Sequence, residues 1–369
     1  MIISILQENL LKALTRTGRI LSSKPQLPIT QSVLLTTKEG RLCAVTTNLE
    51  TTERVWVGAK VEKEGGACVS SRLLTELVLT LPTETARLQG VDGGLSVSCA
   101  GFKASLPGVP TQEFPPTPEI KEKDREKTNK DTFASALSLV LFAAATDEGR
   151  PMLTGARFLT EGKTTTIAAT DGYRLSLKKI PAMSREDLDM VVPARALLEV
   201  VKSSSEEKEA QEIFFSKTDG SQLAFSVGDT DIITRIIDGE YPNIAKIVPT
   251  SFTTRALFDK EQLSRAVKSA AVFARDNANI IRFTLENQAV TISAESAQVG
   301  KNEVEVSSKI DGDGGEIAFN SRFLLEFLAN FPEPEVLFEM TGSLNPGVFR
   351  QVKDDSFLHI IMPVRTTSG

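Results

Sequence analysis

The residue types that usually perform catalysis are scarce in this sequence. It contains one histidine, His359, within the apolar run Phe357-Leu-His-Ile-Ile-Met-Pro363, a pattern typical of a strand. A histidine in such a run is more often packed, or placed at a sheet edge, than used as a base or a metal ligand. No P-loop, dinucleotide-binding glycine motif or nucleophile elbow is present. We therefore predict that the chain has no catalytic residues and is not an enzyme.

Metal-binding chemistry is equally weak. Cys43, Cys68 and Cys99 are odd in number and lack C-x-x-C spacing, so they predict reduced thiols rather than a disulfide frame or a zinc site. The segment from Asp311 to Glu316 superficially resembles a calcium loop. However, Glu316 occupies the sixth position, where the sharp turn of such a loop requires glycine. We predict a hairpin turn there, and neither a metal nor a cofactor.

Basic residues recur at helical spacing, and such residues could bind phosphate. Lys12, Arg16 and Arg19 lie at positions i, i+4 and i+7 of a predicted helix, whereas Leu10 and Leu14 face its opposite side. A later helix with an alanine- and valine-rich face carries a similar set: Lys260, Arg265, Lys268 and Arg275.

Composition limits what these residues can do. The 369 residues hold 42 Lys and Arg against 48 Asp and Glu, a net charge of −6, so phosphate contacts must come from local basic stripes on an acidic body. The N-terminus lacks the basic region of a signal peptide, and the longest apolar stretch, residues 139–145, is too short to span a membrane. We expect a cytoplasmic protein with no membrane partner.

The chain repeats itself three times. Segments 69–78, 192–201 and 319–328 each place an arginine at the fourth position and a glutamate four residues later, surrounded by apolar residues. Self-similarity at a fixed spacing indicates repeated structural units, and each unit here has the size of an ordinary domain. We predict three diverged repeats with boundaries at 1–120, 121–249 and 250–369.

Within each repeat, the pattern predicts two helices and several antiparallel strands, an α+β architecture. The second helix is the repeated segment, and Ser70 or Ser71 is its predicted N-cap in the first repeat. Residues 115–130 are rich in proline and then in charge, which is typical of a linker. The polar stretch 203–209 predicts a solvated loop.

Two interpretations of the basic helices stay open. For any one residue, pairing with a neighbouring acid is the simpler explanation, as Arg72 could pair with Glu76. If equivalent helices of every repeat face one space, they would instead form a positive lining that attracts phosphate without reading bases. The lining would be uneven, because the predicted helix over 132–145 has no basic residue.

Three short motifs carry a family resemblance that covers the whole chain. They are the segment Ala-Thr170-Asp-Gly-Tyr-Arg-Leu175, the segment Asp238-Gly-Glu-Tyr-Pro242 and the terminal Met362-Pro-Val-Arg365. The sequence resembles the bacterial sliding clamp, the beta subunit of DNA polymerase III. The resemblance implies a processivity factor whose three α+β domains, as a head-to-tail dimer, close a six-domain ring around duplex DNA. The alternative is a scaffold of repeats that binds linear peptide motifs without encircling DNA.

The resemblance also implies a pocket between the second and third repeats. It would bind short linear motifs from the replicative polymerase, the clamp loader, repair polymerases and ligase-type proteins. Its implied residues are Leu153, Thr170, Gly172, Tyr173, Arg174, Leu175, Pro242, Lys246, Ile247, Asn320, Phe323, Ile360, Met362, Pro363, Val364 and Arg365.

Two further surfaces are expected. The dimer joint implied by the resemblance involves Lys103, Ala104, Leu106, Val272, Phe273, Glu303 and Glu305. The contacts with double-stranded DNA, independent of its sequence, combine the basic helices with two loop positions that match the family. They are assigned to Lys12, Arg16, Arg19, Lys24, Arg72, Arg150, Arg195, Lys202, Arg265 and Lys268.

Overall fold

The repeated segments form the second helix of each repeat, as predicted. These helices are α2 (Ser71–Thr80), α4 (Ala194–Glu206) and α6 (Ser321–Asn330). In the first repeat the Ser70 side chain accepts a hydrogen bond from the backbone N–H of Leu73, which confirms the predicted cap.

A computed structural model describes residues 1–25, 27–120, 125–218, 221–286 and 288–365. They form two compact units that divide the central repeat. Unit 1 joins Met1–Ala134 to Arg195–Ile236, and unit 2 joins Ser135–Ala194 to the chain from Ile237 onward. The predicted boundaries near residues 120 and 249 stay predictions.

Unit 1 contains one continuous antiparallel sheet. Its strand order is β10-β15-β16-β17-β4-β3-β2-β6-β9-β8-β7-β1-β5. The pairing of β17 with β4 joins the central repeat to the first one, with Thr230 opposite Val55. The strands are β1 (Ile2–Leu6), β2 (Ser32–Lys38), β3 (Arg41–Thr47), β4 (Thr51–Gly58), β5 (Lys60–Lys63), β6 (Gly66–Ser70), β7 (Thr85–Val91), β8 (Gly94–Cys99), β9 (Phe102–Val109), β10 (Glu126–Asn129), β15 (Glu212–Thr218), β16 (Gln222–Val227) and β17 (Thr230–Arg235).

Unit 2 contains two sheets. The larger has the order β14-β11-β12-β13-β26-β25-β24-β18-β22, and the smaller has the order β21-β20-β19-β23. The strands are β11 (Gly155–Glu161), β12 (Thr164–Thr170), β13 (Arg174–Pro181), β14 (Leu188–Pro193), β18 (Thr254–Asp259), β19 (Ile280–Glu286), β20 (Ala289–Ser296), β21 (Gly300–Ser307), β22 (Lys309–Gly312), β23 (Gly315–Asn320), β24 (Glu335–Met340), β25 (Gly347–Arg350) and β26 (Phe357–Ile361).

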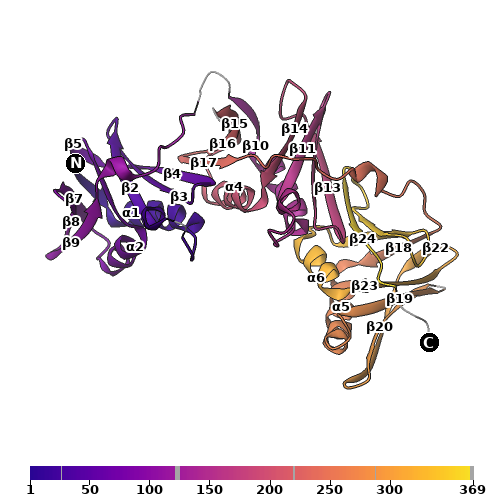
Figure 1. Cartoon of the computed structure of the whole chain (residues 1–369). Helices are drawn as coiled ribbons and strands as arrows, with labels where there is room; N and C mark the ends of the chain where they lie inside the picture. The colour runs from indigo at the N-terminus through magenta and orange to yellow at the C-terminus, as the bar shows by residue number, and fades with distance from the viewer. Residues whose placement is uncertain (26, 121–124, 219–220, 287, 366–369) are drawn as a thin grey trace. The chain divides into compact units, whose positions relative to one another are not determined.

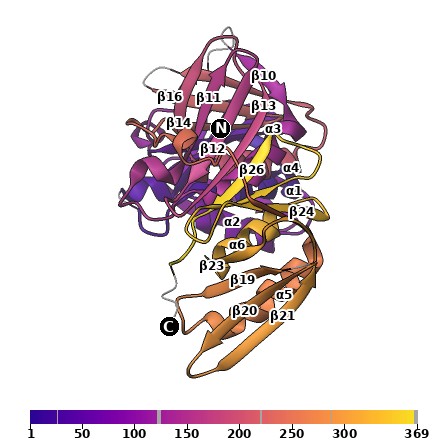
Figure 2. The ribbon, with the colours of Figure 1, turned by 90° about the vertical axis from the view of Figure 1, so that its right-hand side faces the viewer.

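The first helices of the repeats are α1 (Gln7–Thr17), α3 (Lys130–Val140) and α5 (Lys260–Ala274). In unit 1, α1 lies beside α2 (Figure 1). In unit 2, α5 contacts α6 and lies across β19, β20 and β21 (Figure 2). The described residues therefore form six helices packed on antiparallel sheets, and the predicted α+β class is confirmed.

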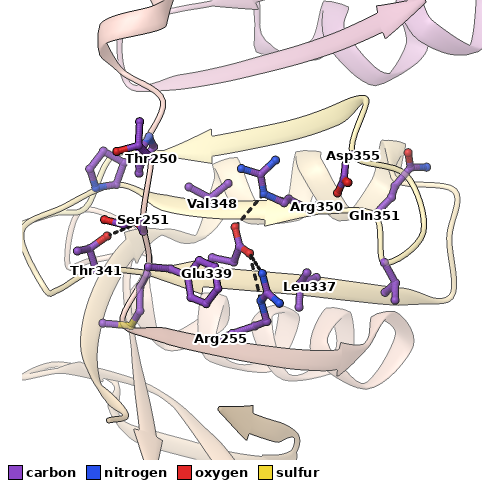
Figure 3. A pocket seen from close by; sticks show the side chains of 15 residues that line it. Thr250, Ser251, Arg255, Leu337, Glu339, Thr341, Val348, Arg350, Gln351 and Asp355 are labelled. Atoms are coloured by element: carbon purple, nitrogen blue, oxygen red, sulfur yellow. Dashed lines mark hydrogen bonds and ion pairs between the residues drawn. The ribbon is translucent and has the colours of Figure 1, made fainter. Parts of the chain in front are cut away.

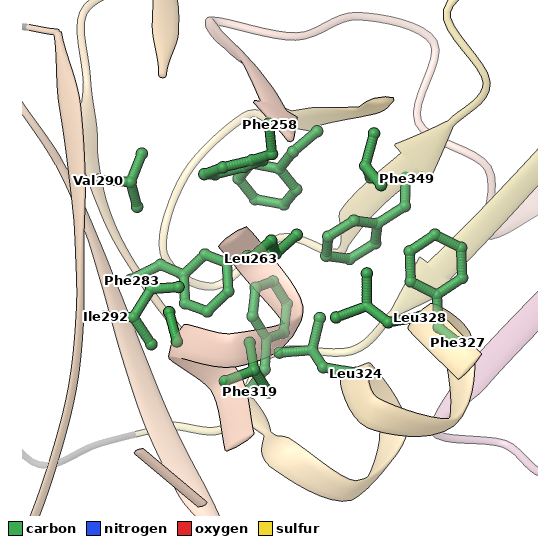
Figure 4. Packing of buried hydrophobic residues seen from close by; sticks show 14 of the residues in the cluster. Phe258, Leu263, Phe283, Val290, Ile292, Phe319, Leu324, Phe327, Leu328 and Phe349 are labelled. Carbon is green, nitrogen blue, oxygen red and sulfur yellow. The ribbon is translucent and has the colours of Figure 1, made fainter. Parts of the chain in front are cut away.

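Phenylalanine dominates the largest core of unit 2 (Figure 4). Phe283 meets Phe319 edge to face, with ring centroids 5.6 Å apart and ring planes at 89°. Leu263 on α5 and Leu324 on α6 are fully buried in the same cluster. Burial of such apolar area is the main force that holds both helices on the sheet.

Three local predictions were wrong. Residues 203–206 continue α4 instead of forming a loop, because Ser203 is buried and the Ser204 hydroxyl bonds to the Val200 carbonyl of the preceding turn. Part of the expected linker, Glu126–Asn129, pairs with β15, and residues 121–124 lie outside the described chain. The turn after Asp311 joins two different sheets, since β22 pairs with β18 and β23 pairs with β19.

Candidate functional site

Strand pairing brings the C-terminal run beside the Thr170–Leu175 motif. β26 pairs with β13, so that Arg174 lies opposite Ile361 and Leu175 lies opposite Ile360. The contact continues past the strand end, where the backbone N–H of Met362 donates to the Tyr173 carbonyl at 2.8 Å. Two of the three motifs that carry the resemblance therefore meet in space.

The turn between β12 and β13 is held by its own side chains. The Thr170 hydroxyl accepts from the Gly172 N–H and donates to the Arg174 carbonyl, at 3.0 and 2.6 Å. Asp171 accepts from the N–H groups of Tyr173 and Arg174 at 2.9 and 3.0 Å. Gly172 has φ +91°, and a Cβ at this position would lie 3.2 Å from a guanidinium nitrogen of Arg150. The turn therefore fixes where Tyr173 and Arg174 point.

Arg174 is a buried cation held on several sides. Its Nε donates to Asp171 at 3.0 Å, and its Nη1 forms an ion pair with Glu326 at 2.6 Å. The guanidinium lies over the ring of Phe323, 4.7 Å from the centroid, and 5.7 Å from that of Phe142. Aromatic faces attract a guanidinium, and the planar group is rigid once it is paired.

Apolar side chains form the surface beside Arg174. Tyr173 is 62% exposed and stacks on Phe323, with centroids 6.3 Å apart and planes at 20°. Met362 is 40% exposed, whereas Leu175 and Ile360 are buried in one cluster with Ile247 packed against it. An exposed aromatic ring and a methionine above a buried apolar floor suit the docking of a partner's apolar side chains.

The other predicted pocket residues have varied positions. Leu153 is buried, and Asn320 caps α6 by accepting from the Arg322 N–H. The backbone N–H of Val364 donates to the Ala318 carbonyl at 2.8 Å, which fixes the terminal segment along β23. Pro363 is partly buried, and the remaining three are exposed: Pro242, Lys246 and Arg365.

Behind this surface lie buried residues that sequence reasoning did not assign to the site. His359 on β26 is fully buried, shares a 2.6 Å hydrogen bond with Ser176, and stacks on Phe327 at 4.8 Å. Burial, and then the nearby Arg174 charge, holds the pKa of His359 well below its usual value of 6.5, so the ring is neutral. The prediction of a packed histidine is confirmed. Phe142 could have been noticed as the only aromatic residue in the apolar stretch 139–145.

The basic stripe that begins on α1 and ends in the 3₁₀ turn Gly18–Ile20 faces carboxylates at the end of α4 and just past it, inside unit 1. Arg16 is almost fully buried and forms ion pairs with Glu206, at 2.7 Å, and with Glu207. Arg19 pairs with Glu206, and Lys12 lies 3.5 Å from Glu207. This cluster gives Arg16 and Arg19 a structural role that their spacing on α1 does not reveal.

A buried carboxyl belongs to the same region. Glu53 on β4 is fully buried, and neither carboxyl oxygen has a hydrogen-bond partner among the described residues. Burial, reinforced by the negative charge of Glu199 on α4, raises the pKa of Glu53 to about 8. Glu53 is therefore mostly protonated at neutral pH.

Several other predicted DNA contacts are exposed. Arg72 pairs with Glu76 at 2.8 Å, as the simpler interpretation predicts, and Arg265 pairs with Glu261 at 2.9 Å. Lys202 pairs with Glu199 at 2.8 Å. The other exposed members of the set are Lys24, Arg150, Arg195 and Lys268.

Comparison with known proteins decides the family. Residues 1–118, 127–243 and 245–365 match the N-terminal, central and C-terminal domains of the DNA polymerase III beta subunit. The chain belongs to the DNA polymerase III beta subunit family. Its function is that of the beta sliding clamp, which is a non-catalytic subunit. The predicted clamp function and the prediction that the chain is not an enzyme are both confirmed.

Relatives in this family match over almost their entire length. The beta sliding clamp of Staphylococcus epidermidis RP62A is 25% identical over 375 residues, covering 98% of this chain and 99% of the relative. That of Staphylococcus aureus Mu50 is 24% identical with the same coverage. The match extends over all three repeats, so the family assignment applies to the whole chain.

Solved sliding clamps share the fold. The Bacillus subtilis clamp superposes with a TM-score of 0.93 at 22% identity, covering 100% of both chains. A Pseudomonas aeruginosa clamp bound to griselimycin gives 0.92 at 23% identity, covering 99% of this chain and 100% of that one. The three-domain clamp fold predicted from the resemblance is therefore confirmed.

The predicted dimer residues of this beta subunit lie on two strands with open edges and on one helix. β21 is the last strand of its sheet, and along β9 only Gly108 and Val109 pair with β6 among the described strands. Lys103, Glu303 and Glu305 are exposed, Ala104 is partly buried and Leu106 is buried. On α5, Val272 is 50% exposed, and Phe273 is partly buried.

The described chain has neither a cluster of metal-binding side chains nor a helix that could cross a membrane. No set of three or more His, Cys, Asp or Glu side chains there is arranged to hold a metal ion. Within the same residues, no helix has the length and apolar character needed to cross a membrane.

Proposed function

We propose that this beta subunit assembles head to tail into a closed dimeric ring around duplex DNA. The ring would hold the polymerase and other proteins through short linear motifs bound at the surface around Arg174. Closure holds DNA by topology, so the subunit needs only weak, sequence-independent contacts with phosphate. Retention of the polymerase on such a ring keeps synthesis processive.

The observation that carries the motif pocket is the pairing of β13 with β26. It supports a site in which Tyr173, Arg174, Phe323, Ile360 and Met362 act together. The buried Arg174 and the apolar surface beside it would suit a motif of glutamine and apolar residues. The pocket comprises the sixteen residues named from the resemblance, and its proposed partners are the replicative polymerase, the clamp loader, repair polymerases and ligase-type proteins.

The open edges of β9 and β21 support the head-to-tail joint. Two different strands that each have one open edge can pair across subunits by adding backbone hydrogen bonds. A contact between two different patches of the subunit can repeat head to tail and so close a ring. A contact between identical patches would instead form a two-fold dimer, which does not close a ring. Val272 on α5 is exposed and supplies apolar area beside the open edge of β21.

DNA contacts are assigned to the exposed basic residues, chiefly Lys24, Arg150 and Lys268. Pairing of the others with acids leaves a weakly positive surface, which suits sliding better than tight binding. Arg16 and Arg19 would support α1 from within their ion-pair cluster. The bacterial relatives and the three free cysteines support action in the cytoplasm.

The ring is tested by negative-stain imaging of the purified full chain at micromolar concentration. Annular particles with six similar lobes support the closed dimer. Three-lobed crescents would contradict a closed ring under these conditions, and compact particles without curvature would contradict the whole arrangement.

The pocket is tested separately with a labelled peptide that carries a glutamine and apolar residues. Arg174→Ala combined with Met362→Ala should lower its affinity at least tenfold while particle shape stays unchanged. The matched control is Val299→Ala, which truncates another exposed apolar side chain in unit 2 and should bind like the parent. Equal affinity of the parent and the double variant would refute the pocket.

A further inference from the structure

A second pocket lies on the nine-stranded sheet of unit 2 (Figure 3). Its walls come from β18, β24 and β25, and from the segment that precedes β18. Its volume is about 320 Å³, large enough for a small part of a peptide. None of its lining residues belongs to the predicted motif pocket, so its chemistry must be considered by itself.

The centre of this pocket is a carboxylate shared by two arginines (Figure 3). Glu339 is buried and accepts from Arg255 Nη2 and Nε at 2.6 and 3.1 Å through one oxygen. Its other oxygen accepts from Arg350 Nε at 2.8 Å. Two guanidiniums against one carboxylate leave one net positive charge.

Part of the Arg350 guanidinium stays available. Arg350 binds Glu339 only through Nε, and its two Nη atoms have no hydrogen-bond partner among the described residues. These two nitrogens form the fork that recognises a carboxylate with two parallel hydrogen bonds. Phe252 covers Arg255, with the guanidinium 4.2 Å from the ring centroid, and so shields that side from water.

An unused acceptor lines the same pocket. Gln351 is only 7% exposed, and its Oε1 has no hydrogen-bond donor in the described chain. A buried amide oxygen without a donor costs free energy unless another molecule supplies one. The pocket therefore offers donors at Arg350 and an acceptor at the next residue.

The charges favour a ligand with one negative charge. Asp355 also lines the pocket, at an exposed position, and forms no ion pair with Arg350 in the described structure. Because Asp355 is exposed, water screens its charge, and the two arginines against Glu339 leave about one positive charge, too little for a dianionic phosphate. A carboxylate that has a hydrogen-bond donor nearby matches both the free fork of Arg350 and the free acceptor of Gln351.

We propose that this pocket binds an aspartate or glutamate side chain of a peptide segment. The carboxylate is held by the Nη atoms of Arg350, and a rotation of the Gln351 side chain lets its shielded Oε1 accept from a backbone N–H of the same segment. Leu337 and Val348 supply apolar walls for a neighbouring side chain. The assignment stands on these contacts and does not depend on the proposed motif pocket.

The two sites share one face of the sheet. Cross-strand pairing runs from Leu175 to Ile360, then to Val348, Glu339 and Arg255. Glu339 is therefore two strands from Ile360, which is roughly 10 Å or about three extended residues. The acidic side chain can belong to the segment that carries the motif, or to a separate segment.

Ligand-observed NMR titration of the full chain tests the proposal. The probe is the capped dipeptide acetyl-Glu-Leu-amide, and its glutamine analogue is the matched control. We expect millimolar binding of the glutamate probe and about tenfold weaker binding of the analogue, since the charge-assisted bonds are lost. Equal binding of the two probes, or displacement by equimolar inorganic phosphate, would overturn the assignment.

Two variants connect the binding to the pocket. Arg350→Lys keeps the charge but removes the fork, and Gln351→Met removes an acceptor that has no bond to lose, so the fold is retained. Each should weaken the probe about tenfold, since each removes hydrogen bonds to a charged or buried group. Arg282→Lys, at an ion pair with Glu316 on the other sheet, should have no effect. Unchanged binding in both pocket variants would also refute the site.

A longer peptide shows whether the acidic residue belongs to the segment that carries the motif or to a separate segment. A glutamate extension of a motif peptide that raises affinity in the parent but not in Arg350→Lys indicates one continuous segment. An extension without effect, together with dipeptide binding, indicates a separate segment. If Arg174→Ala loses motif binding but still binds the dipeptide, the two sites act independently. A failure of the motif pocket can then be distinguished from a failure of the pocket at Arg350.

Discussion

Tyr173 and Phe323 stack on one another, although they come from different repeats of the chain. Tyr173 lies in the turn between β12 and β13, and Phe323 lies in the first turn of α6. The ring of Phe323 also lies against the guanidinium of Arg174. A single side chain on α6 therefore supports two neighbouring residues of the motif pocket.

Replacement of Phe323 by alanine should weaken motif binding about tenfold, because an aromatic pair and a cation–π contact are lost together. Tyr173→Phe should bind like the parent, since the Tyr173 hydroxyl makes no hydrogen bond in the described structure. Fluorescence polarisation with a labelled motif peptide measures both. A loss in Tyr173→Phe equal to that in Phe323→Ala would contradict this account.

Glu53 should make the stability of the protein depend on pH. Its folded pKa of about 8 lies above the usual value of 4.5, so the folded state binds more protons than the unfolded state between these values. Stability from this group is therefore present below about pH 4.5 and falls as pH rises towards 8, by at most about 1.4 kcal/mol per pH unit.

Glu53→Gln keeps a neutral side chain of similar shape and removes this dependence. We expect it to stabilise the protein more at pH 8 than at pH 5, as measured by chemical denaturation at both values. An identical effect at the two pH values would show that Glu53 is ionised in the folded state.

The sequence predicts this molecule well wherever local pattern decides the structure. The helix cap at Ser70 and the second helix of each repeat follow from residue types and spacing alone. The sequence predicts less where a side chain contacts a residue that is distant along the chain. The spacing of Arg16 marks a charged face, but only tertiary packing shows that Glu207 covers it. The Arg255–Glu339–Arg350 network depends likewise on strand register.

Arg16→Met should destabilise unit 1 by up to about 3 kcal/mol, because it leaves Glu206 and Glu207 with fewer cations to pair with. Chemical denaturation measures the loss, and Lys24→Met provides a control for an exposed basic residue. Comparable stability of the two variants would contradict the structural role of Arg16.

Lys268→Glu should leave stability unchanged and weaken DNA association, since Lys268 is exposed on α5. The slope of log affinity against log salt should become shallower by about one for each phosphate contact that is lost. Association with a linear duplex at several salt concentrations measures this slope. Lys309→Glu, an exposed lysine on β22, is the control. An unchanged slope would remove Lys268 from the DNA surface.

Val272→Glu should weaken the proposed dimer. Val272 is half exposed on α5, and a head-to-tail joint would bury it, so a glutamate there would lose its hydration on assembly. We expect the dimer dissociation constant to rise at least tenfold, or about 1.4 kcal/mol, by sedimentation velocity across a dilution series. Val299→Glu, at a similarly exposed valine on the turn before β21, tests whether any added charge has this effect. If both variants dimerise like the parent, the joint does not include α5, and the open edge of β21 must pair elsewhere.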